Sequence, residues 1–232
     1  MDQKQEELFW ETLKIFNEIC LSAHVMLIGS WAEYFYKDMF KTDFRPEIRT
    51  RDIDFMYRNI SIPDEKIPLI AALTQNGYLY TEDPYSGVAK FYKEDLLELE
   101  FLTRVQGSGK ESVYPIRSLD IKSEGLREIN ILADFALEYR KNGLQIILPE
   151  PAVYVIQKIL TNPTRVPVNK KEKDIRSVKN LLVHILQDKY HLEKLKEVIS
   201  YLSKKQNTTL KMVCQKSQIK MPLVGKNKYI MD

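Results

Sequence analysis

The sequence predicts an α+β fold, in which a mixed sheet flanked by helices is followed by a helical C-terminal region. Strand-like and helical patterns alternate over roughly the first 150 residues, whereas only helical spacing occurs after Pro151. The chain has 232 residues, of which 44% are hydrophobic and 29% charged. This composition is typical of a folded globular protein and not of a disordered one. No apolar run approaches the roughly 18–20 residues that span a bilayer, so no membrane partner is expected.

The N-terminal stretch predicts a helix, a strand and a second helix. Apolar side chains recur every three or four positions over residues 5–20, as on one face of a helix. Residues 24–28 have the pattern of a short buried strand that stops at Gly29. A helix over about 30–40 follows, and its aromatic side chains fit a core better than a base-stacking surface. Residues 41–47, which include Asp, Arg and Pro, are expected to form a loop.

The middle of the chain predicts further strands around one helix. Residues 49–57 alternate between apolar and polar side chains, as in a strand with one buried face. A helix over residues 64–76 ends at Gly77, which tolerates the positive φ of a helix terminus. Two hairpins complete this part, one from residues 88–92 and 96–102 and one from residues 135–140 and 144–148.

The last third predicts helices. The first runs to Leu160 and has Pro151 in its first turn, where proline is tolerated; two more are expected over 171–188 and 191–203. We therefore expect a domain that carries the candidate sites, a helical C-terminal domain and a basic tail, over residues 1–150, 151–203 and 204–232.

Charge is distributed unevenly along the chain. The formal net charge is +3, but the tail from Lys204 onward has seven lysines and one acid, Asp232. The tail therefore carries +6 and residues 1–203 carry −3. Such a tail either holds a polyanion such as RNA through its phosphates or is simply solvated.

Cysteine and histidine usage excludes two other classes of protein. Two cysteines, Cys20 and Cys214, supply no disulfide framework for this length, and three scattered histidines leave no zinc-site spacing. A hydrolase based on a cysteine or histidine is also disfavoured, because no histidine lies near a plausible nucleophile. The polar N-terminus does not resemble a secretory signal, so a cytoplasmic location is expected.

Gly29-Ser30, at the junction of the first strand with the second helix, is the first candidate site. A glycine lets a phosphate approach the backbone, and free N–H groups with a serine hydroxyl can bind phosphate oxygens. The alternative is a structural turn followed by a helix cap.

Asp52 and Asp54 form the second candidate site. Side chains two apart on a strand share a face, so both carboxylates converge while Ile53 and Phe55 anchor the strand. Adjacent carboxylates repel each other unless a cation lies between them, and such ligands suit Mg²⁺ or Mn²⁺. The alternative is a solvated acidic face. Glu100, on a later strand, could complete a trio of acids, and Glu98 competes with it on the same face.

These residues carry a resemblance. Leu27-Ile28-Gly29-Ser30, then Asp52-Ile53-Asp54 and a later acid on a strand, resemble the signature of the nucleotidyltransferase superfamily that includes DNA polymerase beta. Over about residues 20–185 the chain more closely resembles an uncharacterised bacterial nucleotidyltransferase-like family. The matching segments are Ile28-Gly29-Ser30-Trp31, residues 48–55, Glu100-Phe101-Leu102 and the stretch from Leu148-Pro149 to Lys158.

The resemblance implies an ATP-binding or other nucleoside triphosphate-binding enzyme that transfers a nucleoside monophosphate to a hydroxyl. Gly29 and Ser30 would bind the β- and γ-phosphates, and Asp52, Asp54 and Glu100 would hold two Mg²⁺ ions. Lys158 and Lys173, in the helical region, would point toward the nucleotide or else lie on the polar faces of amphipathic helices. The acceptor would be an RNA 3′ end, a protein or a small molecule. The stretch between Ser30 and Asp52 is long for the superfamily, and it would either shape the acceptor site or be an insertion.

Three further interpretations follow from the same residues. Superfamily analogy places such an enzyme in a toxin–antitoxin or phage-defence context. A catalytically weak or inactive module of the same fold would instead bind RNA or a protein partner. A glycosyltransferase also uses Asp-x-Asp with a divalent cation, but it normally needs a larger nucleotide-binding domain than the roughly 80 residues spanned here.

Overall fold

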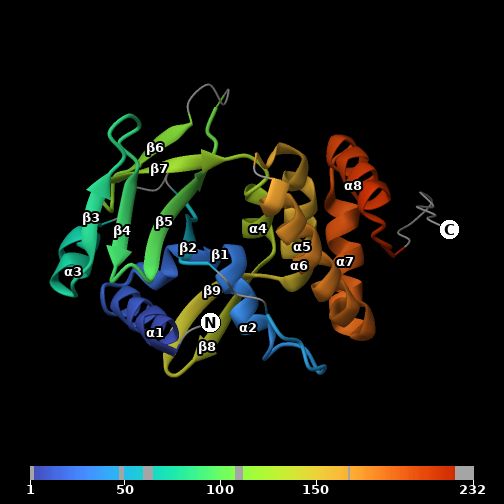
Figure 1. The fold of residues 1–232 in the computed structure, drawn as a ribbon, viewed down its shortest axis with the longest axis horizontal. Coiled ribbons are helices and arrows are strands. Elements are labelled where there is room, and N and C mark those ends of the chain that lie inside the picture. The colour runs from blue at the N-terminus through green and yellow to red at the C-terminus, as the bar shows by residue number, and fades with distance from the viewer. Residues whose placement is uncertain (1–2, 47–49, 60–64, 108–111, 167, 223–232) are drawn as a thin grey trace. The chain divides into compact units, whose positions relative to one another are not determined.

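The computed structural model describes residues 3–46, 50–59, 65–107, 112–166 and 168–222. The chain forms two compact units (Figure 1). The first comprises Met1–Tyr34 and Ile48–Pro149, and the second comprises Phe35–Glu47 and Glu150–Asp232. The expected strand start at Arg49, the helix start at Asp64 and residues 223–232 of the basic tail lie outside the described residues.

The first unit is an α+β sheet domain, as the sequence predicts. Its helices are α1 (Gln3–Glu18), α3 (Leu69–Gln75) and α4 (Asn130–Asp134), with short 3₁₀ turns at Leu21–Ala23 and Gly29–Ala32. Its strands are β1 (Val25–Ile28), β2 (Asp52–Tyr57), β3 (Leu79–Glu82), β4 (Ala89–Lys93), β5 (Leu97–Arg104), β6 (Val113–Ile116), β7 (Ile121–Leu126), β8 (Ala136–Lys141) and β9 (Leu144–Pro149).

The main sheet is mixed. Its strands follow the order β1-β2-β5-β4-β3, and β7 pairs with β5 and β6 (Figure 1). β2 and β5 are parallel, whereas β1 with β2 and β4 with β5 are antiparallel. Both expected hairpins are confirmed, β4–β5 and the separate β8–β9 pair. In the first hairpin, Glu94 and Asp95 adopt positive φ values of 51° and 52°.

One face of this sheet is aromatic. Phe55 of β2 lies between Phe16 of α1 and Phe101 of β5, at ring-centroid distances of 4.8 and 5.9 Å. Phe91 of β4 continues the row, with its ring centroid 6.0 Å from that of Phe101. All four rings are buried. Because side chains alternate along a strand, this packing directs Asp52 and Asp54 to the opposite face.

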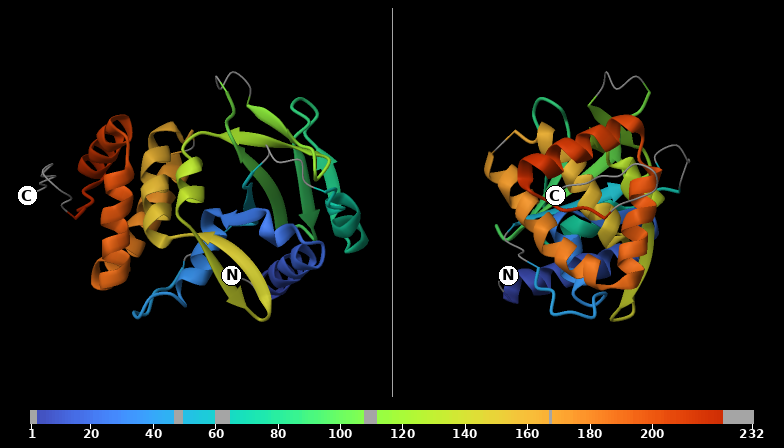
Figure 2. Two further views of the ribbon diagram at one scale, coloured as in Figure 1. Left: turned by 180° about the vertical axis from the view of Figure 1, so that it is seen from behind. Right: turned by 90° about the vertical axis from the view of Figure 1, so that its right-hand side faces the viewer.

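The second unit is helical. It contains α5 (Pro151–Thr161), α6 (Val168–Gln187), α7 (Lys189–Tyr201) and α8 (Lys204–Ser217), with a 3₁₀ turn at Asn162–Thr164. α6, α7 and α8 each pack against α5 (Figure 2). Nine of the eleven residues of α5 are buried, so this helix is the core of the unit.

Two expectations differ from the structure. The helix expected over 30–40 is shorter, because the Gly29–Ala32 turn runs into a four-residue helix, α2 (Glu33–Tyr36). Its aromatic residues are core, as expected: Trp31, Tyr34, Phe35 and Tyr36 are all buried. The stretch from Lys204, expected as a basic tail, begins with helix α8, which buries Leu210, Val213 and Cys214.

Within the described residues, no helix combines the length and the hydropathy of a membrane-spanning segment.

Candidate functional site

The Gly29 turn and the acidic strand β2 meet at the end of β1. Ile28, the last residue of β1, pairs with Asp54 of β2. Gly29 adopts a φ of +65°, and a Cβ on it would lie only 2.1 Å from Oδ2 of Asp54. The Asp54 carboxylate therefore occupies the space that the side chain of any other residue at position 29 would fill. The Gly-Ser motif and the Asp-x-Asp motif, which are separate in the sequence, thus lie together in the fold.

A side chain of α1 hydrogen-bonds to backbone carbonyls next to the two acidic strands. The Gln5 amide donates to the carbonyls of Thr50 and Leu96, at 3.0 and 3.2 Å, just before β2 and β5 begin. The Glu98 N–H donates to the Arg51 carbonyl at 2.9 Å. These bonds fix the register in which the two acid-bearing strands start. The Arg51 guanidinium itself donates to the Asp95 carbonyl at 2.7 Å.

Four carboxylates share one face of β2 and β5. In the parallel register Asp52 lies opposite Glu98, and Asp54 lies opposite Glu100. All four side chains are partly buried. β5 therefore lies directly beside β2, as a trio of acids requires, and this register leaves both Glu98 and Glu100 as candidates for the third carboxylate.

Lys90 of β4 lies at this site, although the sequence patterns did not identify it. Its ammonium contacts Glu98 at 2.5 Å and Glu100 at 2.7 Å. Burial acts to lower the pKa of Lys90, but hydrogen bonds and charge interactions with Glu100 and Glu98 outweigh it and raise that pKa. The signal was present in the hairpin, because pairing the two strands around Asp95 places Lys90 opposite Glu100.

Asp52 and Asp54 have the chemistry that a divalent cation needs. They supply oxygen ligands next to a turn whose glycine has no side chain of its own, which fits Mg²⁺ bound together with phosphate oxygens. Within the described ranges, no three Asp, Glu, His or Cys side chains are grouped so that they could hold a metal ion. The pair fits a metal, and both candidates for the third carboxylate, Glu98 and Glu100, contact Lys90.

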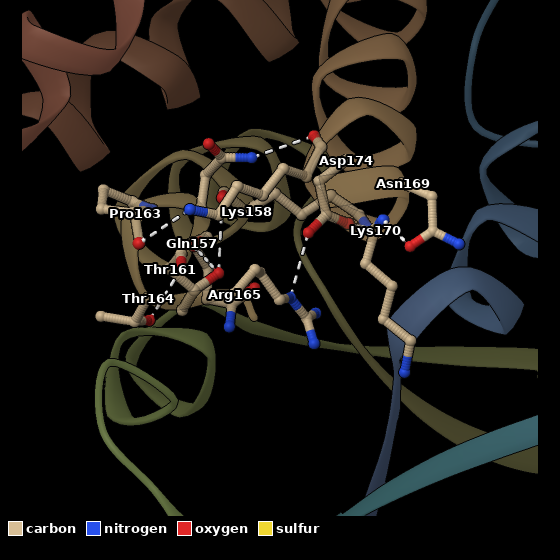
Figure 3. A network of polar contacts seen from close by, with 11 residues as sticks. Gln157, Lys158, Thr161, Pro163, Thr164, Arg165, Asn169, Lys170 and Asp174 are labelled. Carbon is tan, nitrogen blue, oxygen red and sulfur yellow. Dashed lines mark hydrogen bonds and ion pairs between the residues drawn. The ribbon is translucent and has the colours of Figure 1, made fainter. Parts of the chain in front are cut away.

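Lys158 and Lys173 belong to the helical unit. Lys158 of α5 is buried, with its ammonium 2.7 Å from Oδ1 of Asp174 on α6 and 4.9 Å from the ring centroid of Tyr154. Arg165 donates to the second oxygen of Asp174 at 3.1 Å (Figure 3). The alternative of an exposed polar face is wrong for Lys158, which is only 5% exposed. Lys173 of α6 is half-buried.

Residues 35–46, the long stretch before the acidic strand, pack within the helical unit. The ring centroid of Phe40 lies 4.9 Å from that of His191 and 5.7 Å from that of His184. Thr42 Oγ1 is hydrogen-bonded to His184 Nδ1 at 2.5 Å. This stretch is therefore part of the core of that unit, which explains its length.

One known family matches most of the chain. A family model described as nucleotidyltransferase matches residues 11–201. No curated protein matches the chain. Among solved structures, a nucleotidyltransferase-like antigenic protein from Paracoccidioides brasiliensis matches with a TM-score of 0.47 and 17% identity, over 86% of each chain.

Two structures of ANT(2″)-Ia also match. One, in complex with adenylyl-2″-tobramycin, has a TM-score of 0.42 and 12% identity over 89% of this chain and 98% of that chain. The other, a solution structure of this antibiotic-resistance factor, has a TM-score of 0.38 and 12% identity over 83% and 98%. These structural likenesses are loose, whereas the family model spans most of the chain.

Proposed function

Because the chain belongs to the nucleotidyltransferase family, we propose that it transfers a nucleoside monophosphate from a nucleoside triphosphate to a hydroxyl group, using Mg²⁺ or Mn²⁺. The chain is a transferase, and nucleoside triphosphates are the substrates of its family. The acceptor belongs to one of three classes: an RNA 3′ end, a protein side chain or a small molecule. The reaction takes place in the cytoplasm.

One observation carries the proposal: the Asp54 carboxylate lies against the Cα of Gly29. A side chain at position 29 would collide with Oδ2 of Asp54 at 2.1 Å. A phosphate that approaches the Gly29 backbone would therefore come within reach of the β2 carboxylates. Phosphate and carboxylate oxygens together are the ligands that Mg²⁺ prefers.

The residues take distinct roles in this scheme. The Gly29 backbone and the Ser30 hydroxyl bind the β- and γ-phosphates, and Asp52 and Asp54 hold the metal. When bound, the metal lowers the pKa of the acceptor hydroxyl and neutralises charge on the pyrophosphate that leaves. Glu100 is the third carboxylate for the metal and lies near the acceptor hydroxyl. Catalysis then consists mainly of positioning and charge stabilisation.

The two lysines of the helical unit differ in what they offer a nucleotide. Lys158 is buried and already paired with Asp174, so a nucleotide phosphate would have to replace that carboxylate. Lys173 is half-buried on the same helix as Asp174. We propose both lysines as nucleotide contacts, Lys158 by exchanging Asp174 for a phosphate and Lys173 from its half-buried position.

A second function is supported by a separate observation. Lys90 already forms ion pairs with Glu98 and Glu100, as it would in a module that binds RNA or a protein partner and performs little or no transfer. Such a module keeps the nucleotidyltransferase fold, and its glutamates need no metal because Lys90 is their counter-ion.

A thermal-shift panel tests the proposal. The midpoint of unfolding is measured with ATP, GTP, CTP and UTP, each with and without Mg²⁺, for wild type, Asp52→Asn and Glu124→Gln. Glu124 is an exposed acid on β7 of the same sheet and serves as the matched control. At a hundredfold excess over Kd, a ligand stabilises the folded state by about 2.7 kcal/mol.

We expect a metal-dependent shift for at least one nucleotide in wild type and Glu124→Gln, and none in Asp52→Asn. If no nucleotide shifts the wild type, or if Asp52→Asn responds like wild type, the proposed site is wrong. A shift with RNA alone would favour the binding module.

A further inference from the structure

The acidic face of the sheet has an ordered row of charges across three strands. Asp54 of β2 pairs with Glu100 of β5, and Glu100 pairs with Lys90 of β4. In the next row Asp52 pairs with Glu98, and Glu98 pairs with Tyr92. Register pairing therefore brings four carboxylates together with one ammonium group on the same face.

The Lys90 ammonium contacts one glutamate of β5 from each of these two rows. Its ammonium contacts Glu98 at 2.5 Å and Glu100 at 2.7 Å, and the three side chains are 33%, 22% and 32% exposed. Partial burial strengthens these contacts relative to ion pairs in full contact with water. Lys90 is therefore the cation that balances the third-carboxylate position when no metal is bound.

The two glutamates are not equivalent. The Tyr92 hydroxyl donates to Oε1 of Glu98 at 3.5 Å, so Glu98 has a second partner on β4. Glu100 stands opposite Asp54, whose carboxylate lies against Gly29. Release of Glu100 from Lys90 leaves Glu98 with both Lys90 and Tyr92, whereas release of Glu98 breaks two contacts.

We propose that Lys90 is a built-in counter-ion of the metal site. A divalent cation displaces the Lys90 ammonium from Glu100, and the ammonium stays paired with Glu98. This inference rests on the proposed function, because it assumes that Asp52 and Asp54 hold a metal. Lys90 is then a positioning residue: it keeps the two glutamates in place before the metal binds, and it weakens the affinity of the site for that metal. The same reasoning selects Glu100 over Glu98 as the third carboxylate.

Metal titrations of thermal unfolding, without nucleotide, test the inference. Wild type, Lys90→Met, Lys90→Gln and Lys90→Arg are titrated with MnCl₂. Lys90→Gln keeps hydrogen-bonding capacity without the charge. It is expected to behave like Lys90→Met and replaces that variant in the test if Lys90→Met does not fold. Lys93→Met is the matched control, because Lys93 lies on the same strand but donates to the Asn76 carbonyl.

We expect both neutral variants to unfold at a lower temperature than wild type without metal, because four carboxylates then repel each other. The half-saturating Mn²⁺ concentration should fall about tenfold, equivalent to about 1.4 kcal/mol. Lys90→Arg and Lys93→Met should titrate like wild type. A purely structural ion pair would lower the unfolding temperature equally at every metal concentration.

The outcomes separate the two proposals. If wild type and the neutral variants respond to Mn²⁺ at the same concentration, Lys90 does not compete with the metal and the inference is overturned, while the metal site stands. If neither wild type nor the neutral variants respond, the metal site of the proposed function fails as well. A response that occurs only in the neutral variants supports the inference in its strongest form.

Discussion

At the scale of single residues, Gly29 has the clearest physical role. Its φ of +65° lies in the left-handed region that side chains disfavour, and its Cα faces the Asp54 carboxylate. The sequence predicts a glycine turn at this point, since the strand stops there. It does not reveal that the missing side chain makes room for Asp54, because that contact joins residues 25 positions apart.

Gly29→Ala should therefore destabilise the protein more than a glycine substitution that meets only backbone strain. Gly143→Ala is the matched control, because Gly143 has a φ of +76° and nothing within 4 Å of an added Cβ. Left-handed backbone strain alone costs about 1–3 kcal/mol, and Gly29→Ala adds the displacement of Asp54. Urea unfolding measures both variants. Equal free-energy losses would contradict the close contact.

Lys90 is a residue whose ion pairs could not be predicted from the sequence patterns. The sequence predicts the two strands, their hairpin and a shared face for both glutamates. The residue opposite Glu100, which is Lys90, follows only from the exact pairing of that hairpin. Charge pairing across a sheet depends on register, and register is determined by the turn.

At the scale of elements, Lys158 forms a buried ion pair that joins α5 to α6. The family resemblance makes Lys158 a nucleotide contact, whereas helical spacing makes it a residue on the polar face of an amphipathic helix. The structure places it 2.7 Å from Asp174 inside the helical unit. A buried cation with a partner on another helix cannot be recognised from periodicity, because the contact depends on how the helices pack.

Lys158→Met should lower the free energy of unfolding by about 3 kcal/mol, because it leaves the buried Asp174 carboxylate with Arg165 alone. The double variant Lys158→Met with Asp174→Leu should recover most of this loss, since apolar replacement of a buried pair is often nearly neutral. Lys179→Met, at an exposed position on α6, is the control.

Urea unfolding measures the free energy of unfolding of these variants. The thermal-shift panel with nucleotides tests whether Lys158 contacts the nucleotide. A double variant that is stable and still shifts with nucleotide would limit Lys158 to a structural role. Loss of the nucleotide shift in that variant would instead place Lys158 at the nucleotide.

Helix α8 was not predicted from the sequence, because the many lysines of this stretch indicated a basic tail. Leu210 and Val213 have helical spacing, but lysines surround them and dominate the composition. From that composition alone, a tail is expected. In the structure a capping box, in which Ser203 accepts from the Gln206 N–H and the Gln206 side chain accepts from the Ser203 N–H, begins the helix.

At the scale of the whole molecule, the chain path links the two units. The chain leaves the sheet unit after Tyr34 and returns to it at Ile48, and the segment between belongs to the helical unit. Phe40 packs there between His184 and His191. The helical unit is therefore completed by a segment that precedes α5 by more than a hundred residues.

Phe40→Ala should consequently destabilise the protein by about 3 kcal/mol, the usual cost of removing a buried phenylalanine side chain. Asp43→Ala, in the same segment, removes only an exposed ion pair with Arg45 and should have a small effect. Thermal and urea unfolding compare the two. A small effect of Phe40→Ala would mean that this segment contributes little to the core.

The fold class, both hairpins, the shared face of Asp52 and Asp54 and the glycine turn before them could be predicted from the sequence, because each depends on local periodicity or turn chemistry. Three contacts are visible only in the folded chain: Asp54 lies against Gly29, Lys90 bridges Glu98 and Glu100, and Lys158 is buried against Asp174. The tertiary structure also assigned residues 35–46 to the helical unit and made a helix of the start of the basic tail. The physical reason is the same in each case: these features depend on strand register and helix packing, which join residues far apart in the chain.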